Sequence, residues 1–107
     1  MKKEVFLSKQ GETVVEKYLY ESGIYITMGM EREGLAELQK AVNLLEPIEA
    51  EIITRKYLSR ESDYVRHQTI YKDLGISWGT YNKTRLRALT KLGTELGIIS
   101  MVMEDRL

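Results

Sequence analysis

Cysteine is absent from these 107 residues, and histidine and proline occur once each. Without cysteine, the chain has no disulfide, no thiolate metal site and no cysteine nucleophile. His67 alone does not make a zinc cluster. The longest apolar run is a few residues, too short to cross a bilayer, and the apolar stretch near Met1 is too short for a secretory signal. We therefore expect a cytoplasmic protein that uses no cofactor, metal or membrane.

A net charge is also lacking, because 16 Lys and Arg balance 16 Asp and Glu. The charges are nevertheless segregated. Residues 1–54 hold six basic and ten acidic residues (net −4), residues 55–91 nine and three (net +6), and residues 92–107 one and three (net −2). A basic block between acidic flanks indicates a surface for a polyanion, usually nucleic acid. The alternative is a solvated basic face without a partner.

What is present indicates one soluble globular domain, since 43% of the residues are hydrophobic and 30% charged. Helical spacing of apolar residues predicts an all-α fold. The expected helices cover residues 12–21, 31–45, 47–58, 67–74 and 78–96. Residues 22–29 contain β-branched and aromatic residues and are expected to be extended or a linker, and residues 59–66 a surface loop.

The first three expected helices each have a candidate buried stripe. The stripes are Val14, Val15, Tyr18 and Leu19; Leu35, Leu38, Val42 and Leu45; and Ile48, Ile52, Ile53 and Tyr57. Pro47 ends one helix and suits the first turn of the next. Residues 98–103 are apolar and β-prone, so we expect this tail to pack on the core or on a second copy.

Residues 69–83 carry the most informative pattern, a short helix, a glycine turn and a second helix, which is typical of a helix-turn-helix. Ile70 and Leu74 lie one turn apart and are expected to face inward. Gly75 makes the turn, Ile76 fills the corner, and Ser77 caps the second helix. Tyr81 and Thr84 should face back toward the core.

The opposite face of the second helix would enter a DNA major groove. We expect Trp78 to contact a thymine methyl group, Asn82 to pair with adenine, and Lys83 to reach guanine, while Gly79 allows close approach of the backbone. Basic residues beside them suit phosphates. The full candidate DNA-binding set is Ser77, Trp78, Gly79, Thr80, Asn82, Lys83, Arg85, Arg87 and Lys72, with Lys91 next along the basic helix.

Simpler interpretations stand beside these. Trp78 is alternatively a packed core aromatic, and the basic helix face is alternatively only solvated. Tyr57 and Tyr81 fit core positions better than stacking platforms for bases, and His67 fits a helix start better than a catalytic role.

Roughly residues 42–100 resemble the sigma-factor region that reads the −35 promoter element and, more closely, the ArpU-type regulators of temperate phages of Gram-positive bacteria. The resemblance rests on Leu45–Ile53, Ile70–Ser77, Tyr81 and Ala88–Ile98. It implies that the helix from Ser77 to Leu92 reads DNA and that the protein controls late genes for packaging and lysis. Tyr71, where a small residue is usual, and the Trp78-Gly79 pair depart from the pattern.

The sequence thus predicts an N-terminal helical or oligomerisation region (1–45), a sigma region 4-like helix-turn-helix domain (46–100) and a tail (101–107). The expected function is a sequence-specific transcriptional regulator, an activator that binds double-stranded DNA as a homodimer, with RNA polymerase as a further partner. The alternatives are a small-terminase-type DNA-recognition subunit and a module that grips RNA polymerase. We expect no enzyme, because no phosphate loop, metal cluster or nucleophile–base pair is found, and we interpret Glu46, Glu49 and Glu51 as a helix surface.

Overall fold

The structure is a computed structural model that describes residues 6–62 and 64–98. Within these ranges the chain is all-helical, as the sequence predicts. The elements are α1 (Lys9–Thr27), α2 (Leu35–Asn43), α3 (Pro47–Ile53), the π-helical turn η1 (Thr54–Leu58), α4 (His67–Asp73) and α5 (Trp78–Glu95).

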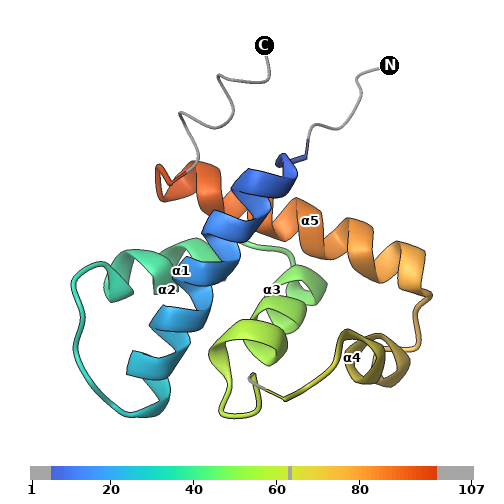
Figure 1. The fold of residues 1–107 in the computed structure, drawn as a ribbon, viewed down its shortest axis with the longest axis horizontal. Helices are drawn as coiled ribbons and strands as arrows, with labels where there is room; N and C mark the ends of the chain where they lie inside the picture. Colours follow the sequence, from blue (N-terminus) through green and yellow to red (C-terminus); the bar gives the residue numbers. More distant parts are fainter. Residues whose placement is uncertain (1–5, 63, 99–107) are drawn as a thin grey trace.

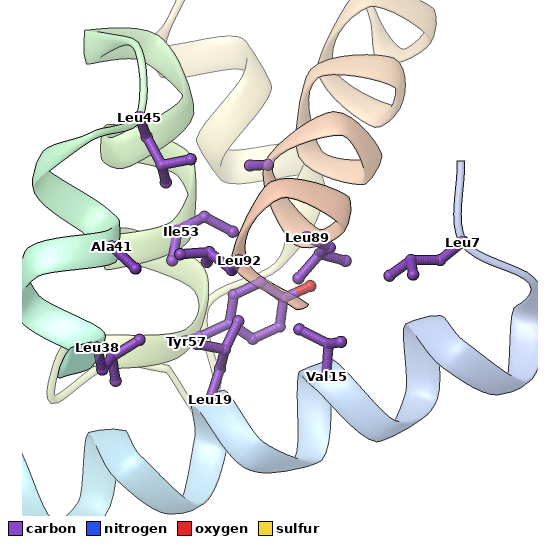
Figure 2. Close-up of a cluster of buried hydrophobic side chains, with 11 residues drawn as sticks. Leu7, Val15, Leu19, Leu38, Ala41, Leu45, Ile53, Tyr57, Leu89 and Leu92 are labelled. Carbon is purple, nitrogen blue, oxygen red and sulfur yellow. The ribbon is translucent and has the colours of Figure 1, made fainter. Parts of the chain in front are cut away.

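The main core lies where α1 crosses η1 and α5 (Figure 1). Val15 and Leu19 of α1 meet Tyr57 of η1 and Leu89 and Leu92 of α5, all fully buried (Figure 2). Residues of α2 and α3 close the other side of this cluster. The N-terminal helices therefore share one core with the chain that follows residue 45.

A second, smaller core joins α4 to the rest of the molecule. Ile52, Ile70 and Tyr81 are fully buried there. Leu74 and Ile76 pack against them and are partly buried. This cluster sets the position of α4 and of the first turns of α5, the part of the chain to which the sequence assigns DNA binding.

Residues 22–29 differ from the expected extended segment, because α1 continues to Thr27 and buries Ser22 and Gly23. Gly23 lies directly against η1, so that a Cβ built on it would be 2.3 Å from the Tyr57 carbonyl oxygen. Tertiary packing thus overrides the local preference of the β-branched and aromatic residues in this segment.

Helix ends follow local signals in most places. Pro47 stands at the start of α3, as predicted. The helix expected from residue 31 begins only at Leu35, because Gly34 before it has a φ of +93°. Ile48 was expected to be buried but is 36% exposed. The expected tail from residue 99 onward lies outside the described residues.

Candidate nucleic-acid interface

α4 and α5 are joined by a tight turn whose parts match the sequence-based expectation. Gly75 has a φ of +69°, a backbone conformation that glycine adopts without strain. Ser77 caps α5, and its Oγ accepts a hydrogen bond from the Thr80 backbone N–H at 3.1 Å. The two helices are thus fixed by backbone geometry at Gly75 and by a side-chain cap at Ser77.

The helical phase of α5 separates a buried face from an exposed one. The buried residues are Tyr81, Thr84, Arg85, Ala88, Leu89, Leu92 and Gly93. Trp78, Gly79, Thr80 and Lys83 are exposed, and Asn82 is partly buried. The first turns of α5 therefore present small, polar, basic and aromatic groups to solvent on one side.

Trp78 is both packed and accessible. Its ring lies 5.9 Å from Tyr81, 6.0 Å from Tyr71 and 6.1 Å from His67, measured between centroids. The side chain is still 49% exposed. Tyr71 and its aromatic neighbours therefore support Trp78 on one side, while another part of the ring faces solvent.

Arg85 is the main correction to the predicted interface. The residue is only 5% exposed. Its Nη2 donates to Glu12 Oε1 at 3.0 Å, and its Nη1 donates to Glu16 Oε2 at 3.2 Å and to Tyr57 Oη at 3.0 Å. A phosphate contact is excluded in this conformation, because the guanidinium faces the core and α1 instead of solvent.

Asn82 belongs to the same hydrogen-bond network as Arg85. Arg85 Nη2 donates to Asn82 Oδ1 at 2.9 Å. Bidentate pairing with adenine uses the amide oxygen as acceptor and the amide nitrogen as donor. The nitrogen is available, whereas the oxygen already accepts one bond and has one lone pair left.

Burial controls the titration of the groups around this network. Burial raises the pKa of Tyr57 far above its ordinary range, although the Arg85 charge opposes the shift. Burial lowers the pKa of Arg85, but Tyr57 and Glu12 outweigh it, so the pKa is raised and the guanidinium stays charged. The network is therefore a hydrogen-bonded ion cluster at neutral pH.

His67, which is partly buried, and Tyr81 form a second polar pair in contact with Trp78. His67 Nδ1 and Tyr81 Oη lie 2.6 Å apart. Burial, helped by the charges of Arg85 and Lys56, lowers the pKa of His67 to about 4, and burial raises that of Tyr81 to about 12. His67 is neutral at pH 7 and is the first residue of α4, as expected.

Part of the basic block is neutralised within the molecule. Lys91 Nζ donates to Glu49 Oε1 at 2.9 Å, and Arg55 Nη2 donates to Asp73 Oδ2 at 2.7 Å. Glu49 is fully buried, which corrects its assignment to a helix surface. Three of the glutamates in the acidic N-terminal half, Glu12, Glu16 and Glu49, thus pair with Arg85 and Lys91.

Lys72 on α4 and Lys83 on α5 are exposed, as are Arg60 and Arg66 in the chain before α4. Arg87 is partly buried on α5. Among the predicted DNA-binding residues, Arg85 is thus buried, and Lys91 is exposed but paired with Glu49. The others are exposed or partly buried: Lys72, Ser77, Trp78, Gly79, Thr80, Asn82, Lys83 and Arg87.

The pairing of Arg85 with its partners was not predicted from the sequence, although the spacing of the residues indicates it. Arg85 lies four residues after Tyr81 and four before Leu89, which places it in the middle of the buried stripe. Glu12 and Glu16 are likewise four residues apart and flank buried Val15 on α1. A charge at a buried phase with opposite charges at helical spacing elsewhere indicates an internal ion pair.

The chain matches no protein-family model, no curated protein and no solved structure. Among the described helices, none combines the length and the apolar character needed to cross a membrane. In the same part of the chain, histidine and acidic side chains form no group of three that could hold a metal ion.

Proposed function

We propose that this protein binds double-stranded DNA with the first turns of α5 in the major groove and regulates transcription. The proposal rests on the exposed residues Trp78, Gly79, Thr80 and Lys83 in the first turns of α5. The tight turn and α4 fix the position of this part of the helix. A recognition helix of a helix-turn-helix reads bases with its N-terminal residues.

The side chains divide by role. Trp78 offers an apolar surface to a thymine methyl group, Lys83 reaches a guanine, and the Asn82 amide nitrogen donates to a base edge. Gly79 lets the helix backbone approach the DNA closely. Lys72 and Arg87 suit phosphates, which position the protein without reading sequence.

The oligomeric state and the biological role are proposed on other grounds than the exposed face of α5. A single helix-turn-helix covers few base pairs, so we propose a homodimer on two half-sites about 34–36 Å apart or a multiple of that distance. The resemblance of residues 42–100 to ArpU-type regulators supports activation of late phage genes as the biological role.

Some residues of the basic block pair with acidic residues within the molecule. We therefore expect a weaker salt dependence of DNA binding than the net charge of the block indicates. Each phosphate contact contributes about −0.9 to the slope of log K against log salt. With Lys72 and Arg87 as the proposed phosphate contacts, we expect a slope of about −2 per protomer. A protein that used all of its basic residues in this block would show a far steeper dependence.

The first experiment selects duplexes from a random pool and titrates the winner and a scrambled duplex at several salt concentrations, with the mass measured in solution. Lys83→Ala should lose about 1–3 kcal/mol at one base position and relax the preference there. Lys72→Ala should weaken binding to every duplex and reduce the salt slope by about 1.

Lys40→Ala is the matched control, because Lys40 is an exposed lysine on α2, which packs against the C-terminal half of α5. It should leave affinity and preference unchanged. An absence of DNA binding at low salt would overturn the proposal in favour of an RNA-polymerase-binding module. Ring-sized oligomers that bind DNA would favour the small-terminase type.

A further inference from the structure

The end of α1 and the connection to α2 form an exposed apolar groove. It is lined by Ile24, Tyr25, Met28 and Met30, with Glu21 and Arg32 at its polar edges, and has a volume of about 450 Å³. Ile24 is 54% exposed, Met28 65% and Met30 49%. Exposed apolar residues that lie together on a surface mark interaction sites more often than isolated ones do.

The chemistry around the groove is acidic. Residues 21–37 hold four glutamates and one arginine, a net charge of −3. The arginine, Arg32, is engaged, because its guanidinium lies 5.1 Å from the Tyr25 ring and 5.6 Å from the Tyr18 ring and its Nη2 is 3.8 Å from Glu21 Oε1. Glu31 and Glu33, on either side of it, are exposed.

We propose that this groove binds a basic amphipathic helix of a partner protein. Flexible methionines accept apolar side chains of varied shape. An amphipathic helix lays its apolar face in such a groove, and lysine or arginine residues on its flanks would meet Glu31 and Glu33. The net negative charge of residues 21–37 disfavours nucleic acid and anionic membranes as occupants.

The position of the groove fits a binding site that is separate from the proposed DNA-binding face. In Figure 1 the end of α1 and the chain leading to α2 lie at one end of the longest axis, and α4 and the start of α5 lie toward the other. A helix bound in the groove therefore leaves Trp78 and Lys83 open. The two surfaces can be tested separately, because neither shares a residue with the other.

The test measures binding of the full chain to a fluorescent helical peptide of about 14 residues made of leucine and lysine, about four turns long. A peptide with glutamate in place of lysine is the charge control. We expect saturable binding of the lysine peptide only. The double change Met28→Asp and Met30→Asp should weaken it at least about tenfold, and Glu31→Lys with Glu33→Lys should weaken it and remove its salt dependence.

Val14→Asp is the matched control, since Val14 is an exposed apolar residue on the same helix but does not line the groove. It should leave peptide binding intact, and circular dichroism should show that every variant is folded. Equal binding of both peptides, or no effect of the methionine changes, would overturn the proposal. Self-association that Met28→Asp abolishes would assign the groove to a second copy instead.

Discussion

Arg85 and Lys83 are two residues apart on one helix and have opposite environments. Lys83 is exposed, whereas Arg85 is held by Glu12, Glu16 and Tyr57. Residue type does not distinguish them, because both are long cations in the same basic segment. Helical phase does, because two residues correspond to about 200° of rotation around the axis.

Arg85→Ala should therefore lower the free energy of unfolding by about 2–3 kcal/mol, since it leaves Glu12 and Glu16 without their partner. Urea unfolding followed by circular dichroism measures this loss. Lys83→Ala should stay within about 0.5 kcal/mol of the wild type. If the two variants unfolded alike and Arg85→Ala weakened only DNA binding, the internal ion cluster would be wrong.

His67 provides a prediction of pH dependence. Its pKa of about 4 lies below the ordinary 6.5. As the pH falls from 6.5 to 4, the unfolded chain takes up a proton that the folded protein does not, so stability falls through this window and levels off below it. The partly exposed ring limits the effect to roughly 1–2 kcal/mol.

The measurement is urea unfolding of the wild type and His67→Gln between pH 4 and pH 7. Glutamine keeps a hydrogen-bond acceptor for Tyr81 but does not titrate, and the carboxylates contribute equally to both proteins. We expect the free energy of the wild type to fall more steeply with decreasing pH. Parallel curves would show that His67 is not responsible.

At the scale of elements, two glycines within helices have different reasons to be glycine. Gly23 lies where α1 touches the backbone of η1, and a Cβ there would be 2.3 Å from the Tyr57 carbonyl oxygen. A Cβ on Gly79 meets only Ser77 Oγ at 4.0 Å. The first glycine is required by the crossing of two elements, and the second is not required by the fold.

Gly23→Ala should destabilise the protein by about 1–3 kcal/mol, because backbone atoms must move apart. Gly79→Ala should stabilise it by roughly 0.5–1 kcal/mol, the helix-propensity difference between the residues. Thermal unfolding compares the two signs. A loss of DNA affinity in the more stable Gly79→Ala variant would add support for close approach of DNA at this position.

At the scale of the whole molecule, the segregated charges of the sequence meet in three dimensions. Glu12 and Glu16 of α1 pair with Arg85, and Glu49 of α3 pairs with Lys91. α1 also supplies Val15 and Leu19 to the core around Tyr57, Leu89 and Leu92. Part of the charge asymmetry therefore serves folding, and the net charge of the basic block overstates the positive charge left at the surface.

The shared core leads us to expect that residues 46–98 do not unfold cooperatively when produced alone, since they would expose apolar surface and leave Arg85 without Glu12 and Glu16. Thermal circular dichroism of this fragment and of the full chain is the measurement. Adding a peptide of residues 6–30 should restore helical signal. A sharp transition in the fragment alone would support the separate N-terminal region (1–45) that the sequence predicts.

The sequence by itself determined the helices around the proposed interface. Pro47, Gly75 and Ser77 act through their own backbone and side-chain geometry, so their effects are local and can be read from a few neighbouring residues. The buried positions Ile52, Ile70 and Tyr81 followed equally well, because a helix repeats with a known period.

Only the tertiary structure decided the continuation of α1 through residues 22–27, the burial of Glu49 and the role of Arg85. Each depends on a partner 34 or more positions away, as Gly23 does on Tyr57, Glu49 on Lys91 and Arg85 on Glu12. A local pattern states what a residue prefers in isolation, whereas packing and charge pairing depend on which surfaces the fold brings together.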